Sequence, residues 1–173
     1  MTSAAEPVGE APASFAVADE AALGRLAGRL AAALGGRAFI ALSGDLGAGK
    51  TTLVKALAAA VGVDPAEVTS PTFGLIHVHE PPAAAGLARK PARIVHADLY
   101  RLADAGELRE TGWDDAIAGD AWVLVEWPER AAAALPADRI DVAIEITGPE
   151  ARRVAFTGRG PAAAAIVRRL ADA

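Results

Sequence analysis

The chain lacks cysteine altogether, and it has neither a basic, apolar leader at its start nor a charge-free run long enough to cross a bilayer. The absence of cysteine excludes disulfides and thiolate metal sites, and it fits a reducing compartment. The mean hydropathy of +0.27 arises largely from alanine, so it does not indicate membrane affinity. We therefore expect a cytoplasmic protein that makes no contact with membranes.

Positive charge is also scarce. The chain has 17 Lys and Arg against 22 Asp and Glu, which gives a formal net charge of −5 at pH 7. Extended, self-sufficient binding of RNA or DNA needs clustered Lys and Arg to neutralise the phosphates. If a nucleic acid takes part in the function, we expect a partner protein to hold it.

The most informative segment that is present is rich in glycine: Gly44-Asp45-Leu46-Gly47-Ala48-Gly49-Lys50-Thr51-Thr52. Its first eight residues match G-x-x-x-x-G-K-[ST], the phosphate-binding loop. The glycines allow backbone N–H groups to turn toward a phosphate. Lys50 can reach the β- and γ-phosphates, and the Thr51 hydroxyl can bind Mg²⁺. We predict that this segment binds a nucleoside triphosphate.

The surroundings of this loop support the prediction. Residues 37–42 form an apolar run typical of a buried strand, and residues 52–61 have apolar positions at helical spacing. A helix that begins at the loop directs its positive end toward the phosphates. The alternative is a glycine-rich loop that only turns the chain, and the strand before it and the helix after it argue against that alternative.

The rest of the chain predicts one α/β domain over residues 14–173, preceded by a disordered tail of Ala, Pro, Gly and Glu over residues 1–13. We expect a sheet like that of P-loop NTPases, with a mainly parallel core, an antiparallel C-terminal hairpin and helices on both faces. The expected strands are 14–17, 37–42, 73–79, 93–98, 121–126, 139–146 and 152–156. The expected helices are 19–34, 52–61, two short ones between 102 and 117, 128–134 and 161–170.

Two of these strands end on a carboxylate, Asp98 and Glu126. Ligand-contacting residues of open α/β sheets lie at the carboxyl ends of strands, beside the phosphate loop. A protein with such a loop needs one acidic group for Mg²⁺ and often a second to orient the attacking water. Glu126 follows the cleaner apolar run and is the better candidate for the metal. The alternative for both is a carboxylate that caps a helix or pairs with an arginine.

Other polar segments leave alternatives open. The segment Thr69-Ser70-Pro71-Thr72 is compatible with a simple turn and equally with a switch whose hydroxyls face the γ-phosphate. His77 and His79 lie on one face of a strand and could bind a metal, but no third ligand is obvious, so a packed or solvated pair is favoured. Trp127 follows Glu126 and could lie against the nucleotide.

Four segments in this order resemble the TsaE family, formerly YjeE, the small ATPases of the bacterial tRNA threonylcarbamoyladenosine pathway. The segments are the phosphate loop, Ser70-Pro71-Thr72-Phe73, His96-Ala97-Asp98-Leu99-Tyr100-Arg101-Leu102 and Val125-Glu126-Trp127-Pro128-Glu129. The phosphate loop is shared by many families, whereas the other three segments in this order are much more specific. The resemblance covers roughly residues 15 to 158.

The resemblance implies an ATPase that uses ATP and Mg²⁺ and assists the proteins TsaD and TsaB. These partners install threonylcarbamoyl on the adenosine beside the anticodon of tRNAs that read A-starting codons, so contact with tRNA would be indirect. Thr51 and Glu126 are implied as magnesium ligands, Lys50 as the phosphate grip, and Asp98 as a catalytic or switch carboxylate. The segment 70–72 is implied as the first switch. The tail and the loop 80–91 depart from the compact members, and no role carries over to them.

Two other functions compete with this one. A small-molecule kinase needs an acceptor pocket and usually an arginine-bearing lid, and the stretch from Leu102 to Trp122 offers only Arg109. A regulatory GTPase needs an N-K-x-D element to read guanine, and the chain has no asparagine. The kinase is therefore the stronger alternative to the ATPase.

Overall fold

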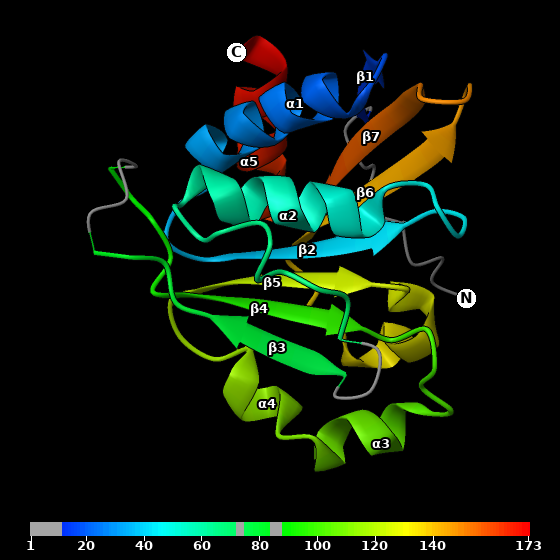
Figure 1. Cartoon of the computed structure of the whole chain (residues 1–173). Helices are drawn as coiled ribbons and strands as arrows, with labels where there is room; N and C mark the ends of the chain where they lie inside the picture. Colours follow the sequence, from blue (N-terminus) through cyan, green and yellow to red (C-terminus); the bar gives the residue numbers. More distant parts are fainter. Residues whose placement is uncertain (1–11, 72–74, 84–87) are drawn as a thin grey trace, which may run out of the picture.

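The computed structural model describes residues 12–71, 75–83 and 88–173, which form one sheet with helices on both of its faces (Figure 1). The strands are β1 (Ala13–Val17), β2 (Ala38–Ser43), β3 (Ile76–His79), β4 (Arg93–Asp98), β5 (Ala121–Glu126), β6 (Arg139–Ile146) and β7 (Arg152–Arg159). The helices are α1 (Glu20–Ala33), α2 (Lys50–Ala60), α3 (Ala105–Glu110), α4 (Trp113–Ala116), the 3₁₀ helix η1 (Pro128–Ala134) and α5 (Pro161–Asp172). None of these helices is long and apolar enough to cross a membrane.

The sheet has the strand order β1-β7-β6-β2-β5-β4-β3. Strand β2 pairs in parallel with both β5 and β6, and β4 pairs in parallel with β5. Strand β7 is antiparallel to β6 and β1, and β3 is antiparallel to β4. The predicted parallel core and the antiparallel C-terminal hairpin are both confirmed.

The two central strands, β2 and β5, are buried on both faces, which explains why their sequences are continuous apolar runs without alternation. The carboxyl ends of β2, β4 and β5 lie at the same edge of the sheet, because these strands are parallel. This edge receives the glycine-rich loop after β2, Asp98 at the end of β4 and Glu126 at the end of β5. The topology therefore gathers the predicted site residues.

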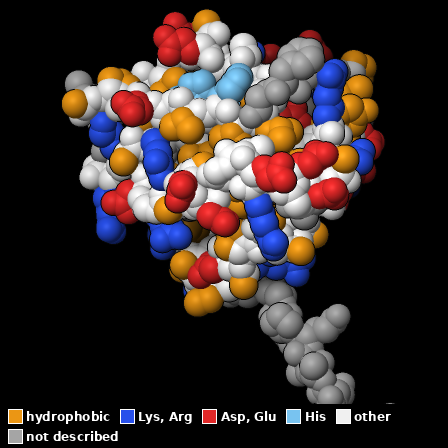
Figure 2. Space-filling view, turned by 90° about the horizontal axis from the view of Figure 1, so that it is seen from below, with side chains coloured by type: hydrophobic (Ala, Val, Ile, Leu, Met, Phe, Trp, Pro, Cys, Tyr) orange, Lys and Arg blue, Asp and Glu red, His pale blue; other side chains and the backbone are white. Residues whose placement is uncertain are grey.

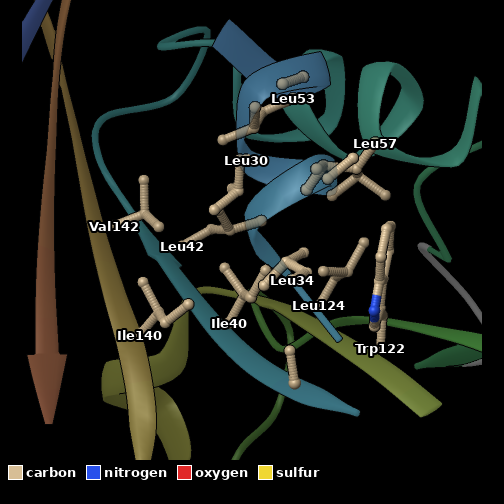
Figure 3. Close-up of a cluster of buried hydrophobic side chains, with 14 of the residues drawn as sticks. Leu30, Leu34, Ile40, Leu42, Leu53, Leu57, Trp122, Leu124, Ile140 and Val142 are labelled. Carbon is tan, nitrogen blue, oxygen red and sulfur yellow. The ribbon is translucent and has the colours of Figure 1, made fainter. Parts of the chain in front are cut away.

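One face of the sheet is covered by α1, α2 and α5. Figure 3 shows part of the apolar core between the helices and the sheet. Its labelled side chains come from α1, α2, β2, β5 and β6 and from Leu34, the residue after α1. Each large aliphatic side chain buried in this way stabilises the fold by about 1.5–3 kcal/mol. The indole nitrogen of Trp122 donates to the carbonyl oxygen of Gly35 at 2.7 Å. Asp19 caps α1, where it accepts from Ala22 N at 2.7 Å.

The opposite face carries a second apolar cluster under α3, α4 and η1, with Trp113, Leu99, Leu108 and Val125 among its buried members. The two short helices predicted between residues 102 and 117 are present, separated at Thr111 and Gly112. Gly112 has a φ of 76°, which favours glycine. The strands β4 and β5, which carry Asp98 and Glu126 at their ends, therefore pack against this second apolar cluster.

The predicted boundaries differ from the structure at a few places. Helix α2 begins at Lys50, two residues earlier than predicted, because Gly49 enters it in the left-handed region without a side-chain cap. The segment 128–134 is a 3₁₀ helix with a kink at Ala131. Ala13 belongs to β1 and not to the predicted tail, whose residues 1–11 lie outside the described part. Residues 72–74 and 84–87 also lie outside it, and with them parts of the predicted strand 73–79, the segment 69–72 and the loop 80–91.

Candidate active site

The loop between β2 and α2 has the backbone that a phosphate-binding loop requires. Gly44, Gly47 and Gly49 have φ angles of 147°, 77° and 108°, all in the region that favours glycine. At Gly44 a side chain would also collide with β6, because a Cβ there would lie 2.5 Å from the carbonyl oxygen of Ile144. At Gly44 the loop therefore lies directly against the sheet, with no room for a side chain.

Lys50, the first residue of α2, is only 4% exposed. Its Nζ donates to the carbonyl oxygens of Gly44 at 2.6 Å and Asp45 at 2.9 Å. The same ammonium lies 4.0 Å from the centre of the Trp127 ring. Burial lowers the pKa of Lys50, and the nearby carboxylates, Glu126 first, oppose that shift. The ammonium is thus held over the loop, beside the carboxylates of Glu126 and Asp98 at the ends of β5 and β4.

The predicted magnesium ligands meet in the structure. The Thr51 hydroxyl donates to Oε1 of Glu126 at 2.8 Å. His96 Nε2 lies 2.8 Å from the same oxygen, and the imidazole is fully buried. Glu126 itself is 2% exposed. Two neighbours therefore fix one carboxylate oxygen. One of them, His96, begins one of the family-like segments, but the sequence alone predicts no role for it at the site.

Asp98 lies directly beside Glu126, since the two residues are paired across β4 and β5. Its carboxylate accepts from the Ser70 hydroxyl and from the backbone N–H of Tyr100, the latter at 3.0 Å. The segment predicted as a turn or a switch therefore reaches this carboxylate through Ser70. Thr69 is exposed.

These groups line one cleft of about 390 Å³. Its walls include Lys50, Thr51, Asp98, Glu126 and Trp127, together with Leu46, Gly47, Gly49, Thr52, Ser70, Tyr100 and Arg101. The Tyr100 and Trp127 rings are 4.9 Å apart, and Trp127 has a φ of 59°, unusual for a residue other than glycine. A second hollow, of about 230 Å³, shares Gly47, Gly49 and Thr52 with the first and lies on the side of Arg152.

The donor set fits a hard cation bound together with a phosphate. A hydroxyl that donates its proton to Glu126 keeps its lone pairs available, and hydroxyl and carboxylate oxygens are suitable ligands for Mg²⁺. No group of three or more His, Asp or Glu side chains able to hold a metal exists in the described part of the chain. That is compatible with Mg²⁺, which usually takes few protein ligands and shares substrate phosphates. The rings of His77 and His79 are 6.4 Å apart, and among the described residues no third side chain joins them in a possible metal site.

A family model and two curated relatives carry the same family name. The family model "Threonylcarbamoyl adenosine biosynthesis protein TsaE" matches residues 17–154. The chain is 40% identical over 136 residues to the tRNA threonylcarbamoyladenosine biosynthesis protein TsaE of Streptomyces coelicolor, with 76% of this chain and 87% of that protein covered. It is 34% identical over 121 residues to the protein of the same name from Bacillus subtilis, with 70% of each covered.

A solved structure shares the fold. The crystal structure of Bacillus subtilis YdiB has a TM-score of 0.75 and 24% identity, over 96% of this chain and 98% of that one. The likeness supports the α/β fold of P-loop NTPases that the sequence predicts. The family match and the identities to the curated relatives lead to one conclusion: the chain belongs to the TsaE family.

Proposed function

We propose that the protein is a cytoplasmic, Mg²⁺-dependent ATPase that assists a TsaB–TsaD pair in the threonylcarbamoyl modification of the adenosine beside the anticodon. The observation that carries the ATPase part is the hydrogen bond from Thr51 to Glu126, next to Lys50 in one cleft. The pathway is supported by the names of the relatives, which assign those proteins to tRNA threonylcarbamoyladenosine biosynthesis.

In this proposal each side chain has a distinct task. Lys50 would donate to the β- and γ-phosphates, and the N–H groups of the loop would bind the oxygens from below. Thr51 and Glu126 would hold Mg²⁺, which when bound neutralises charge on the phosphates. His96 would keep Oε1 of Glu126 in place. The nucleoside would extend toward the hollow beside Arg152, since that hollow shares three loop residues with the main cleft.

Asp98 would orient the attacking water. Its carboxylate is fixed by Ser70 and by Tyr100 N, so its position depends on the connection that leads from α2 to β3. Attack of the water on the γ-phosphorus breaks the bond to the bridging oxygen and leaves ADP and inorganic phosphate. Because little covalent chemistry falls to the protein, positioning accounts for most of the catalysis.

The surface charge supports a role in which partners hold the tRNA. Figure 2 shows the face on the side of β3, α3 and α4, where Lys and Arg side chains are interspersed with Asp and Glu. Binding of RNA by the chain alone would require a contiguous basic patch. The net charge of −5 points the same way.

The test is phosphate release from ATP with Mg²⁺ and with an excess of chelator. We expect release only with the cation. A panel of nucleosides and hydroxy acids, incubated with ATP labelled in the γ-phosphate, separates the ATPase from the kinase. Label in inorganic phosphate alone supports the proposal, whereas label on a panel member would favour the kinase.

A further inference from the structure

We propose that Arg152 is a positioning residue that holds the glycine-rich loop in its phosphate-accepting conformation, an inference that rests on the proposed nucleotide binding. Arg152 begins β7 and is distant from the loop in sequence. Its Nε donates to the carbonyl oxygen of Ala48 at 2.8 Å, and its Nη2 to that of Gly47 at 3.3 Å. The guanidinium therefore contacts the loop through the outward-facing carbonyls and leaves the N–H groups of the loop to the phosphate.

The same guanidinium is anchored to the β6–β7 turn. Its Nη1 donates to the carbonyl oxygens of Ala151 at 2.8 Å and Gly148 at 3.1 Å. These bonds fix the side chain to the rigid hairpin, whose strands are paired over their whole length. A planar group with five donors can bridge two backbone segments in this way, and a lysine ammonium cannot reproduce that geometry.

The geometry of the peptide unit explains why these bonds matter for phosphate binding. In a planar trans peptide the C=O and the following N–H point in opposite directions. When Arg152 holds the Ala48 carbonyl outward, the Gly49 N–H must point to the other side, into the concave face of the loop. With φ angles in the glycine region at Gly47 and Gly49, this loop has other conformations open to it, and Arg152 selects one of them.

The carbonyl contacts of Arg152 do not compete with an ion pair, although Asp19, Glu20 and Glu150 line the same hollow. No carboxylate in the described part of the chain lies within ion-pair distance of it, so its contacts are carbonyl oxygens. Its neighbour Arg153 differs in this respect, since it is exposed and pairs with Glu145 at 2.9 Å. The pair Arg152 and Arg153 thus provides a matched comparison of two arginines adjacent in sequence.

The experiment compares Arg152→Ala with the control Arg153→Ala in the full chain. Hydrogen exchange without nucleotide is expected to show faster exchange in the loop, residues 44–51, in Arg152→Ala only. Calorimetry is expected to show ATP affinity reduced about tenfold or more in Arg152→Ala and unchanged in Arg153→Ala. Guanidinium ion at low millimolar concentration should restore part of the lost affinity, which a general loss of folding would not allow.

The outcomes separate this inference from the proposed function. If the wild-type chain binds no ATP, the proposed function fails, while the exchange measurement still tests whether Arg152 orders the loop. If the wild type binds ATP and Arg152→Ala binds it equally well, the inference is wrong and the function stands. Loop exchange in Arg152→Ala that is no faster than in the Arg153→Ala control would likewise overturn it.

Discussion

The ammonium of Lys50 is held by two backbone carbonyls and the face of Trp127, a ring at the edge of the second apolar cluster. We therefore expect Lys50→Ala to remain folded and to lose about tenfold to a hundredfold in ATP affinity, the effect of charged hydrogen bonds. Calorimetry measures the affinity and circular dichroism the fold. Lys55→Ala, on the same helix, is the control. Unchanged ATP affinity in Lys50→Ala would remove the phosphate-loop assignment.

Glu126 and Asp98 differ in their contacts, and this difference ranks them. Glu126 binds Thr51 and His96, whereas Asp98 binds Ser70 and a backbone N–H. We expect Glu126→Gln to keep nucleotide affinity near that of the wild type and to suppress Mg²⁺-dependent turnover, because an amide is a poor ligand for a hard cation. Glu145→Gln, at an exposed position, is the control. Turnover that survives in Glu126→Gln and disappears in Asp98→Asn would reverse the ranking.

Among the elements, α1 contains a glycine that alanine can replace, whereas the phosphate loop contains one that alanine cannot replace without strain. Gly24 lies in α1, and a Cβ at this position would have nothing within 4 Å, so Gly24→Ala should raise the free energy of unfolding by about 0.5–1 kcal/mol. Gly44 has a φ of 147° and a carbonyl oxygen 2.5 Å from where its Cβ would lie, so Gly44→Ala should lower it by more than about 1 kcal/mol. Urea unfolding of both variants tests the pair. Equal effects would contradict the close approach of the loop to β6.

Strand β3 carries a histidine whose burial makes stability depend on pH. Burial lowers the pKa of His79, with His96 and His77 adding to the shift and Glu67 opposing it, and in the described part of the chain its Nε2 has no hydrogen-bond partner. The folded state therefore binds a proton at His79 less readily than the unfolded state does. As a result, the contribution of His79 to the free energy of unfolding is highest above about pH 6.5 and decreases as the pH falls below that value. We expect His79→Gln to flatten the acid side of the stability curve. An unchanged acid slope would show that other groups cause it.

Strands and helices can be predicted wherever one physical signal dominates. The apolar run of β5 predicts the observed bounds of that strand, because fully buried strands are continuous apolar runs. The bounds of β4 are also as predicted, although His96 interrupts its apolar residues. The start of α2 escapes such a prediction, since Gly49 provides no side-chain cap for a pattern to detect. The contacts of His96 with Glu126 and of Arg152 with the loop depend on the strand order. The segment that contains His96 supports the family resemblance, but neither it nor the position of Arg152 in a strand predicts these contacts.

The whole molecule places its site at one edge of the sheet, partly open to solvent. Leu46 is 77% exposed and Tyr100 46% exposed, and both line the cleft beside the catalytic candidates. An apolar and an aromatic side chain exposed at the rim of the cleft are available for contact with a partner. Ser70, which donates to Asp98, lies between α2 and β3 in the segment 61–71, whose residues form no helix or strand. From these two features we infer that a partner completes the site.

The inferred completion of the site by a partner predicts that turnover depends on that partner. We expect ATP turnover by the isolated protein to be slow and to rise by about tenfold or more when a TsaB–TsaD pair is added, because closure orients the water and excludes solvent. Phosphate release is measured for the protein alone, with the pair, and with an unrelated protein at equal concentration. Nucleosides and hydroxy acids should have no effect, since no acceptor takes part. Turnover that is indifferent to the pair, with acceleration by a small-molecule acceptor, would contradict the partner-dependent ATPase and favour a kinase.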